Sequence, residues 1–358
     1  MGSNIVIIVF KRVFKWILLS IIIQLVILTY FNFVYIPGIG GAIETTKMVD
    51  DSANNNSAST QGFVLKTTKA KIPGNALQTK LSYDCSYAGY ITDGKLNIVD
   101  VNTGAILKTF EQQGKKVSYF KWLYDRNLVL YAYASTDYSG RIQMLSYDMG
   151  TGLEHSYPEE YMPSSSEIVD IELSPLTNVC YTKVKTSDTR SRIYKYNIMS
   201  NFSIIMRTDL GIRIDETKYS DSLIYQDYSN DIQVMDGMNN TTTALGFNMN
   251  VALLDIDSED NIYAGELNSV GKVTKIHFGK ADKKPVSSWK TANLSTSVLP
   301  QNINITPSEK IYEVNVNDGS IYSVSDRKQI DFKGKYIEAL DNGIAINNNG
   351  NLELLVSK

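Results

Sequence analysis

Residues 96–110 read LNIVDVNTGAILKTF, and this stretch predicts two short strands joined by a tight turn. Apolar residues recur up to Asp100, Gly104 closes the turn, and a second apolar run ends at Phe110. Alternation with a period of two is typical of strands, while Asp, Asn and Gly supply the backbone conformations that a turn requires. The unit is therefore a predicted β-hairpin.

The hairpin unit repeats along the chain. It returns as IQMLSYDMGTGLEHSY at residues 142–157, and weaker copies span 193–205, 232–240, 272–289 and 320–332. The turns of these units fall near residues 104, 152, 201, 240, 282 and 327. Spacings of roughly 40–49 residues are typical of four-stranded blades, and several such blades in one chain predict a β-propeller.

The first half of each repeat also recurs, at residues 83–92, 119–134, 168–183, 217–227, 251–265 and 303–314. The last piece, 337–356, holds enough sequence for two or three strands, and residues 62–71 form a single strand at the other end. A ring commonly completes its last blade with a strand from the opposite terminus, because this removes an exposed sheet edge. We therefore predict an all-β domain built as a β-propeller of seven blades, with six or eight blades as alternatives.

Two stretches resemble known propeller repeats. VDVNTGAILKTF at residues 99–110 resembles the strand pair of YVTN-type and quinoprotein-type repeats, and VALLDIDSEDNIYAG at 251–265 is similar to the core of NHL-type repeats. The resemblance covers residues 62–358 and implies a fold far more than a function. The tryptophan docking positions of quinoprotein propellers and the Gly-His and Trp-Asp signatures of WD repeats are absent from the sequence. The resemblance therefore implies no quinone, and we expect no cofactor.

One long apolar run stands apart from the repeats. Residues 16–36 read WILLSIIIQLVILTYFNFVYI and contain no charged side chain. A helix of about 20 apolar residues spans a bilayer core, so the run predicts a single-pass transmembrane helix that acts as a signal-anchor. Three residues shortly before the run are Lys or Arg, whereas the next cation after it is Lys47, so the positive-inside rule places the N-terminus in the cytoplasm. A cleaved signal peptide, with Gly40 and Ala42 near the cleavage site, and a buried core helix are the alternatives.

The predicted anchor divides the chain into four parts. They are a cytoplasmic N-terminus at 1–15, the transmembrane helix at 16–36, a flexible tether at 37–61 and an extracytoplasmic propeller at 62–358. Residues 45–61 (TTKMVDDSANNNSASTQ) are mostly small and polar, which is typical of a spacer. A tether of this length would keep the propeller close to the outer face of the membrane.

Composition narrows the classes of partner. The formal net charge is −3, which argues against a nucleic-acid partner because such a partner requires a concentrated basic surface. Asn, Ile, Lys and Tyr are frequent, as expected from an AT-rich bacterial genome, and Tyr also suits strands. Cys85 and Cys180 are predicted to be free, buried residues rather than a disulfide.

A search for catalytic patterns finds none. His155 and His277 are the only histidines available for a Ser–His–Asp arrangement, and we expect both to be exposed strand residues. The sequence contains neither a Gly-x-Ser-x-Gly motif nor a glycine-rich phosphate loop between a strand and a helix. We therefore predict no catalytic residues and no enzyme activity.

Four carboxylates lie within one short segment, at Asp255, Asp257, Glu259 and Asp260. Ca²⁺ prefers about six to eight oxygen ligands from such clusters, so Asp255, Asp257 and Asp260 are calcium candidates. The segment lacks the glycine of an EF-hand loop and lies between two predicted strands, where Asp, Ser and Asn form an ordinary hairpin. No Cys or His spacing predicts zinc. We expect the hairpin rather than a metal site.

Two further groups of residues have both a structural and a functional interpretation. Lys280, Lys283 and Lys284 are predicted to form a solvated hairpin tip, with a contact to anionic lipid or wall polymer as the alternative. Aromatic side chains gather in one repeat and are predicted to pack mainly between blades, with the others lining a face for sugars or peptides. They are Tyr119, Phe120, Trp122, Tyr124, Tyr131, Tyr133 and Tyr138.

These observations predict a membrane-tethered, non-enzymatic protein-interaction or scaffold module at the envelope of a bacterial cell. The expected partner is an envelope or membrane protein, or a cell-wall polymer. A carbohydrate-binding or ligand-sensing domain is the first alternative. A hydrolase or lyase whose carboxylates converge at the ring axis is the second.

Overall fold

The computed structural model describes residues 15, 16, 20, 24, 63–137, 139–174, 179–197, 200–226, 231–283 and 285–357. Two compact units are distinguished, 1–58 and 59–358. Lys15, Trp16, Ser20 and Gln24 are helical, but the rest of the predicted membrane helix at 16–36 and the predicted tether at 37–61 lie outside the described residues. Among the residues that are described, no helix has the length and the apolar character needed to cross a bilayer.

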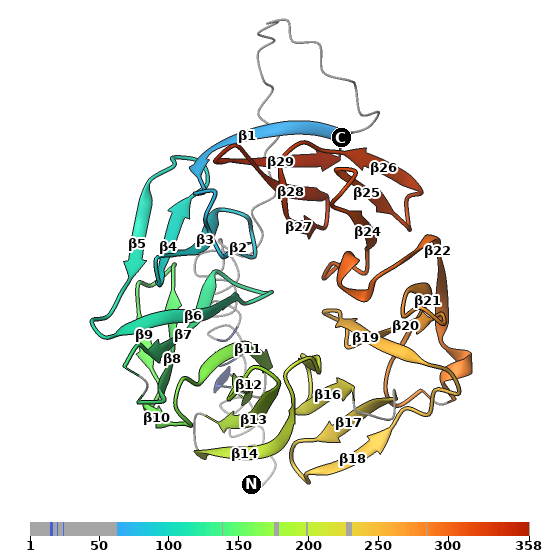
Figure 1. Ribbon diagram of the computed structural model, residues 1–358, viewed down its shortest axis with the longest axis horizontal. Coiled ribbons are helices and arrows are strands. Elements are labelled where there is room, and N and C mark those ends of the chain that lie inside the picture. The colour runs from blue at the N-terminus through green and yellow to red at the C-terminus, as the bar shows by residue number, and fades with distance from the viewer. Residues whose placement is uncertain are drawn as a thin grey trace, which may run out of the picture. The chain divides into compact units, whose positions relative to one another are not determined.

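The described residues from Phe63 onward form seven antiparallel sheets arranged as a ring (Figure 1). We number these blades in chain order. Blade 1 contains β2 (Gln78–Leu81), β3 (Tyr87–Thr92), β4 (Lys95–Asp100) and β5 (Ile106–Phe110). Blade 2 contains β6 (Lys115–Trp122), β7 (Leu128–Ser135), β8 (Arg141–Asp148), β9 (Glu154–Ser156) and β10 (Glu160–Tyr161). Blade 3 contains β11 (Glu167–Ser174), β12 (Val179–Lys185), β13 (Arg190–Asn197) and β14 (Ser200–Asp209).

The remaining blades follow the same plan. Blade 4 contains β15 (Ile214–Glu216), β16 (Ser222–Gln226), β17 (Ile232–Asp236) and β18 (Thr241–Ala244). Blade 5 contains β19 (Val251–Ile256), β20 (Ile262–Leu267), β21 (Val273–Gly279) and β22 (Lys290–Val298), with the 3-10 helices η2 (Val286–Ser288) and η3 (Pro300–Asn302) on either side of β22. Blade 6 contains β23 (Ile303–Ile305), β24 (Ile311–Asn315), β25 (Ser320–Ser323) and β26 (Lys328–Asp331). Blade 7 contains β27 (Lys335–Leu340), β28 (Gly343–Asn348), β29 (Asn351–Ser357) and β1 (Phe63–Lys71).

The two ends of this ring are joined within blade 7. Strand β1 pairs antiparallel with β29, from Phe63 opposite Ser357 to Lys71 opposite Asn351. Figure 1 shows β1 lying along the outer side of β29. The predicted closing strand and the predicted number of seven blades are therefore confirmed.

The predicted hairpin turns lie between the third strand of a blade and the strand that follows it. Those near residues 104, 152, 240, 282 and 327 match such loops. The turn predicted near residue 201 lies close to the junction of β13, which ends at Asn197, and β14, which begins at Ser200.

An aspartate at the start of several turns explains why the hairpin unit repeats. The Oδ1 atom of Asp100 accepts backbone N–H hydrogen bonds from Asn102 at 2.9 Å and Thr103 at 2.7 Å. Asp148 and Asp236 accept two backbone N–H bonds each in the equivalent turns. Such side-chain bonds satisfy backbone donors that the hairpin leaves unpaired, which favours Asp at this place in the repeat.

Strand order defines two faces of the ring. Within a blade, neighbouring strands are antiparallel, from the innermost first strand to the outermost one. The loops between second and third strands therefore lie on the same face of the ring as the connections from one blade to the next. We call this the connector face; in blades 5 and 6 it includes residues 245–250, 268–272, 299–302 and 316–319. The other loops of each blade form the opposite face, which we call the turn face.

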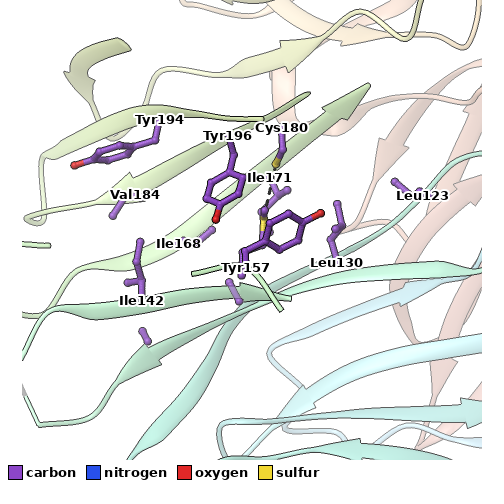
Figure 2. Packing of buried hydrophobic residues seen from close by; sticks show 13 residues of the cluster. Leu123, Leu130, Ile142, Tyr157, Ile168, Ile171, Cys180, Val184, Tyr194 and Tyr196 are labelled. Atoms are coloured by element: carbon purple, nitrogen blue, oxygen red, sulfur yellow. Dashed lines mark hydrogen bonds between the residues drawn. The ribbon is translucent and has the colours of Figure 1, made fainter. Parts of the chain in front are cut away.

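Apolar side chains pack between neighbouring blades. Figure 2 shows one such cluster, in which Leu130 and Ile142 of blade 2 meet Ile168 and Val184 of blade 3. Because side chains alternate along a strand, each inner strand contributes to the interfaces on both of its sides. The core is therefore a series of inter-blade layers.

The aromatic residues of blade 2 belong mainly to these layers, as predicted. Phe120, Trp122, Tyr131 and Tyr133 are buried in the cluster between blades 1 and 2. Tyr119 and Tyr124 are half-buried, and Tyr138 lies outside the described residues. The core interpretation of this aromatic group is confirmed.

Polar contacts on the turn face connect consecutive blades. The Nδ2 of Asn127 in blade 2 donates to Asp84 Oδ2 in blade 1 at 2.8 Å. The hydroxyl of Ser308 in blade 6 donates to Asp341 Oδ1 in blade 7 at 2.7 Å. These bonds fix one blade against the next where the apolar layers end.

Candidate functional site

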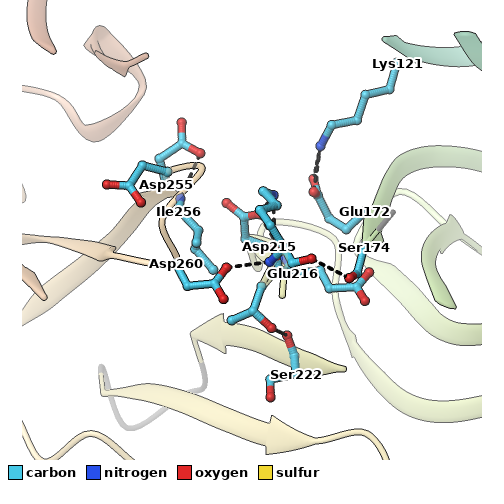
Figure 3. A network of polar contacts seen from close by, with 12 residues as sticks. Lys121, Glu172, Ser174, Asp215, Glu216, Ser222, Asp255, Ile256 and Asp260 are labelled. Atoms are coloured by element: carbon cyan, nitrogen blue, oxygen red, sulfur yellow. Dashed lines mark hydrogen bonds and ion pairs between the residues drawn. The ribbon is translucent and has the colours of Figure 1, made fainter. Parts of the chain in front are cut away.

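Seven charged residues meet where the first strands of blades 2–5 face one another across the inner part of the ring. Figure 3 labels four of them, Lys121, Glu172, Asp215 and Asp255. They come from β6, from β11, from β15 with its flanking residues, and from β19. We call them the axial cluster, which comprises Lys121, Asp170, Glu172, Arg213, Asp215, Lys218 and Asp255.

Three aspartates occupy the same position in consecutive blades. Asp170, Asp215 and Asp255 each use Oδ1 to accept the backbone N–H of the next residue, at 3.0, 2.8 and 2.9 Å. The pairing register shifts beside Asp170 and beside Asp255. A bulge at such a place re-aims a side chain, which accounts for the aspartates turning toward the other inner strands.

Three of the four carboxylates of the cluster have a cation beside them. The Nζ of Lys121 lies 2.6 Å from both carboxylate oxygens of Glu172, as Figure 3 shows. Lys218 Nζ lies 3.5 Å from Asp215 Oδ1. In blade 5, Asp255 Oδ2 lies 3.5 Å from an Nη atom of Arg213. Asp170 instead accepts the hydroxyl of Tyr119 at 3.0 Å.

Burial and neighbouring charges move the pKa values of these carboxylates in different directions. Burial raises the pKa of Asp255 to about 6 in spite of Arg213. Burial also raises the pKa of Glu172, although Lys121 opposes the change. For Asp215, burial acts upward too, but the nearby cations, Lys218 first, outweigh it and lower the pKa. Carboxylates with separated pKa values are the arrangement that acid–base catalysts use.

Access and pairing favour a structural role for the cluster. The Glu172 side chain is 7% exposed, and Lys121 engages both of its oxygens. Asp215 is also buried and paired, so neither group is free to exchange a proton with a substrate. Ion-pair networks that hold a fold together perturb pKa values as catalytic sites do. We therefore interpret the axial cluster as a network that fixes blades 2–5 against one another.

One carboxyl next to the cluster has no polar partner. Glu216 follows Asp215 in β15 and is fully buried. Among the described residues, no hydrogen-bond partner reaches either of its oxygens. Burial raises the pKa of Glu216 well above its ordinary value, and the carboxylates of Glu172 and Asp221 add to the effect of burial. The neutral, protonated form is therefore the favoured one.

The structure separates the three calcium candidates. Asp255 belongs to the axial cluster. Asp257 accepts two backbone N–H groups of its own turn, both at 2.9 Å. Asp260 accepts the backbone N–H of Lys218 from the preceding blade. Within the described part of the chain, no three His, Cys, Asp or Glu side chains are grouped so that they could hold a metal ion.

The histidines and cysteines lie in four different places. His155 is exposed in β9, as predicted. His277 is only 12% exposed and its Nε2 lies 3.1 Å from Glu266 Oε2, so the prediction of an exposed histidine is wrong there. Glu266 belongs to the neighbouring strand β20, and the ring of Phe247 lies on the imidazole with the two ring centroids 6.1 Å apart. Both cysteines are free; Cys180 is buried as predicted, whereas Cys85 is only half-buried because it lies in a turn.

The predicted basic loop in blade 5 has mixed exposure. Lys283 is exposed and Lys280 is half-buried, while Lys284 lies outside the described residues. The backbone carbonyl of Lys283 accepts the indole N–H of Trp289 at 2.8 Å. This contact fixes the loop on the edge of the blade.

Sequence reasoning singled out only one member of the axial cluster, Asp255, as a calcium candidate in a segment that we expected to be an ordinary hairpin. The signal that was missed is a recurring aspartate. Asp170, Asp215 and Asp255 each follow an apolar residue, and their spacing is nearly that of the repeats. An acidic residue at one fixed place in the inner strand of several blades must meet its equivalents at the axis. The turns could be predicted from the sequence because their side-chain hydrogen bonds join residues only two or three positions apart.

Exposed apolar side chains gather on the connector face of blades 5 and 6. Met249, Val270, Leu299 and Val316 are between 39% and 70% exposed. All four stand in the connector-face loops defined above. On the turn face of the same two blades, no large apolar side chain among the described residues is as exposed. The connector face of blades 5 and 6 therefore differs from their turn face in carrying exposed apolar side chains.

No protein-family model and no curated protein matches the sequence. Among solved structures, the β-propeller domain of Cps50 (Swd1) from Myceliophteria thermophila is similar, with a TM-score of 0.53, 11% identity, and coverage of 83% of this chain and 100% of that chain. A chain of the mitotic checkpoint complex has a TM-score of 0.51 and 11% identity, and the match covers 87% of this chain and 99% of that one. At this level of identity the likeness concerns the fold, and the resemblance to YVTN-, quinoprotein- and NHL-type repeats stays a prediction. The described chain is a seven-bladed β-propeller.

Proposed function

We propose that this chain is a non-enzymatic protein-interaction or scaffold module, held on the outer side of a bacterial cell membrane by the apolar segment 16–36. Its partner is an envelope or membrane protein that binds the connector face of blades 5 and 6. A cell-wall polymer is the alternative partner.

One observation carries the choice of face. Met249, Val270, Leu299 and Val316 expose apolar surface on four loops of the same face. Single exposed apolar residues are common on proteins, but several on one face of neighbouring elements are typical of an interface. The likeness to a chain of the mitotic checkpoint complex supports protein partners in general, because that propeller is part of an assembly.

The location outside the membrane rests on the sequence. The run at 16–36 has the length and the apolar content of a membrane span, and the cations stand before it. A ring that begins soon after such a span would present its faces to neighbouring membrane proteins.

Site-specific photo-crosslinking in intact cells tests the choice of face. A photoreactive amino acid is placed at Val270 or Val316 of the full chain and, as a matched control, at Met238, which is exposed on the turn face of blade 4. We expect a defined protein adduct from positions 270 and 316 and none from 238. Equal adducts from all three positions, or no adduct from any, would contradict the proposed interface.

The membrane part is tested separately. Reporter enzymes that are active on only one side of the membrane are fused before residue 15 and after residue 358. We expect the first fusion to report the cytoplasm and the second to report the outside. Removal of residues 16–36 should release the protein from carbonate-washed membranes. If the chain lacking this segment stays in the membrane, the anchor is wrong although the interface result still stands.

A further inference from the structure

A second surface feature lies on blade 3, apart from the axial cluster. A pocket of about 550 Å³ is formed by the outer strands β13 and β14, the loop between β12 and β13, and the connection from blade 2. Arg190, Arg192 and Arg207 line it, together with the hydroxyl side chains of Thr186 and Ser187 and the ring of Pro163. Its volume falls in the range of small-molecule sites, about 300–1,000 Å³.

Two of these arginines lie directly opposite each other. Arg192 on β13 and Arg207 on β14 are register partners in the antiparallel pair. Directly opposed residues of an antiparallel pair project to the same face with their Cβ atoms about 5 Å apart, so like charges at such a position repel and destabilise the sheet. An anion bound between the two guanidinium groups would reduce this repulsion and so lower its cost to the stability of the sheet.

Within the part of the chain that the structure describes, no carboxylate takes this place. The guanidinium of Arg190 is paired with Asp209 at 2.8 Å, and Asp188 in the neighbouring loop is paired with Lys185 at 3.2 Å. Among the described residues, no carboxylate lies within ion-pair distance of Arg192 or Arg207. The pocket therefore carries two positive charges without counter-ions.

The pocket also contains a neutral group that can form hydrogen bonds, a serine hydroxyl. Ser187 lines the pocket, and its Oγ accepts the backbone N–H groups of Thr189 at 3.4 Å and Arg190 at 3.1 Å. A serine hydroxyl is a donor as well as an acceptor. Guanidinium groups bind phosphate through paired, charge-assisted hydrogen bonds, and a hydroxyl complements them. The volume exceeds that of a bare ion, so there is room for a group attached to the phosphate.

We propose that this pocket on blade 3 binds a phosphate group, carried either by a small phosphate ester or by a phosphodiester polymer. The Arg192 and Arg207 guanidinium groups clamp the phosphate oxygens between them, and Ser187 donates a further hydrogen bond. Binding relieves the repulsion between the two arginines, so the ligand stabilises the sheet as well as occupying the pocket. The site is independent of the protein interface on blades 5 and 6.

Thermal unfolding of the full chain in mild detergent tests the proposal. Inorganic phosphate, glycerol 3-phosphate, poly(glycerol phosphate) and citrate are compared with sodium chloride at matched ionic strength. We expect the phosphate compounds to raise the melting temperature of the wild-type protein where chloride and citrate do not. The assignment is overturned if citrate raises the melting temperature as much as phosphate does. It is also overturned if sodium chloride raises the melting temperature as much as phosphate and citrate do.

Variants separate a binding role from a structural one. R192Q and R207Q should each weaken phosphate binding at least tenfold while keeping or raising the melting temperature measured without phosphate, because the repulsion is gone. R126Q is the matched control, since Arg126 is exposed, paired with Asp125 and located in blade 2; it should bind phosphate as the wild type does. Unchanged binding in R192Q and R207Q overturns the proposal. Polymer binding more than tenfold tighter per phosphate than glycerol 3-phosphate identifies a polymer as the source, and equal binding identifies a small ester.

Discussion

The hydroxyl of Thr68 in β1 donates a hydrogen bond of 2.7 Å to the backbone carbonyl of Leu352 in β29, 284 residues further along the chain. This bond belongs to the strand pair that joins the first and the last part of the ring. Without β1, the edge of β29 would lose the strand that pairs with it from Phe63 to Lys71.

The first prediction concerns this closure. A protein that starts at Ile72 lacks β1, whereas a control that starts at Ser59 keeps it. The six register pairs of β1 and β29, at about 0.5–1.5 kcal/mol per hydrogen bond, predict a loss of about 3–9 kcal/mol in the free energy of unfolding. Urea titration followed by tryptophan fluorescence measures the difference. Equal midpoints for the two proteins would show that β1 does not hold the ring.

The second prediction compares two glycines in equivalent turns. Gly104 and Gly152 both have a positive φ, +76° and +70°, so alanine is strained at either position. A Cβ at Gly104 would also lie 2.4 Å from the carbonyl oxygen of Lys69 in β1, whereas at Gly152 the nearest atom is 3.7 Å away. We expect G152A to cost about 1 kcal/mol, and G104A about 2–3 kcal/mol because the closing strand must shift. Chemical denaturation of both variants measures which of them loses more free energy of unfolding. A larger loss in G152A than in G104A would contradict the close approach of β1 to Gly104.

The third prediction concerns the buried carboxyl of Glu216. The unfolded chain releases this proton above its ordinary pKa near 4.5, whereas the folded chain retains it because burial raises the pKa. The folded state then binds more protons, so the stability of the wild type falls as pH rises through this range. In E216Q there is no proton to lose. Its stability should exceed that of the wild type by an amount that grows by about 1.4 kcal/mol per pH unit and vanishes near pH 4.

Urea unfolding at pH 4, 6 and 8 measures this difference. The groups that act on Glu216 are Lys218, Glu172, Asp221 and Asp215, and none of them is changed in E216Q. E259Q removes an exposed carboxylate from the blade 5 turn and serves as the control. A pH-independent difference between E216Q and the wild type would mean that Glu216 is ionised in the folded protein.

The fourth prediction uses the unequal burial of Lys121 and Glu172. The Lys121 side chain is 35% exposed and the Glu172 side chain 7%. In E172Q the freed lysine can still reach water, so we expect a loss of about 1 kcal/mol. In K121M a buried carboxylate loses its cation, which should cost about 2–4 kcal/mol. The double variant should lose less than the sum of the two.

A double-mutant cycle by chemical denaturation measures this coupling. The exposed pair Lys95 and Glu111 in blade 1 provides the reference, since exposed ion pairs contribute about 0–1 kcal/mol. Equal losses in K121M and E172Q would indicate that the inner part of the ring is open to water at this point.

Local chemistry made the architecture predictable. The repeated strand pairs follow from alternating apolar residues, and the turns follow from side chains such as Asp100 that bond to backbone only two or three residues away. Because each repeat carries its own signal, the number of blades follows from the spacing of the repeats.

The candidate sites depend on which residues face each other after folding. Asp255 stands in a run of carboxylates in the sequence, yet its ion-pair partner in space is Arg213, which precedes β15 of blade 4. Likewise, His277 lies beside Glu266 because β20 pairs with β21. No local pattern reports such neighbours.

From the sequence alone come the repeat, the closing strand, the seven blades and the expected membrane segment, because periodicity, turn chemistry and an uninterrupted apolar run are properties of neighbouring residues. Only the tertiary structure decided that Lys121 and Glu172 form an ion pair and that Glu216 is buried with no hydrogen-bond partner among the described residues. It also decided that Arg192 stands opposite Arg207. The reason is physical: burial, charge pairing and strand register are set by contacts between blades.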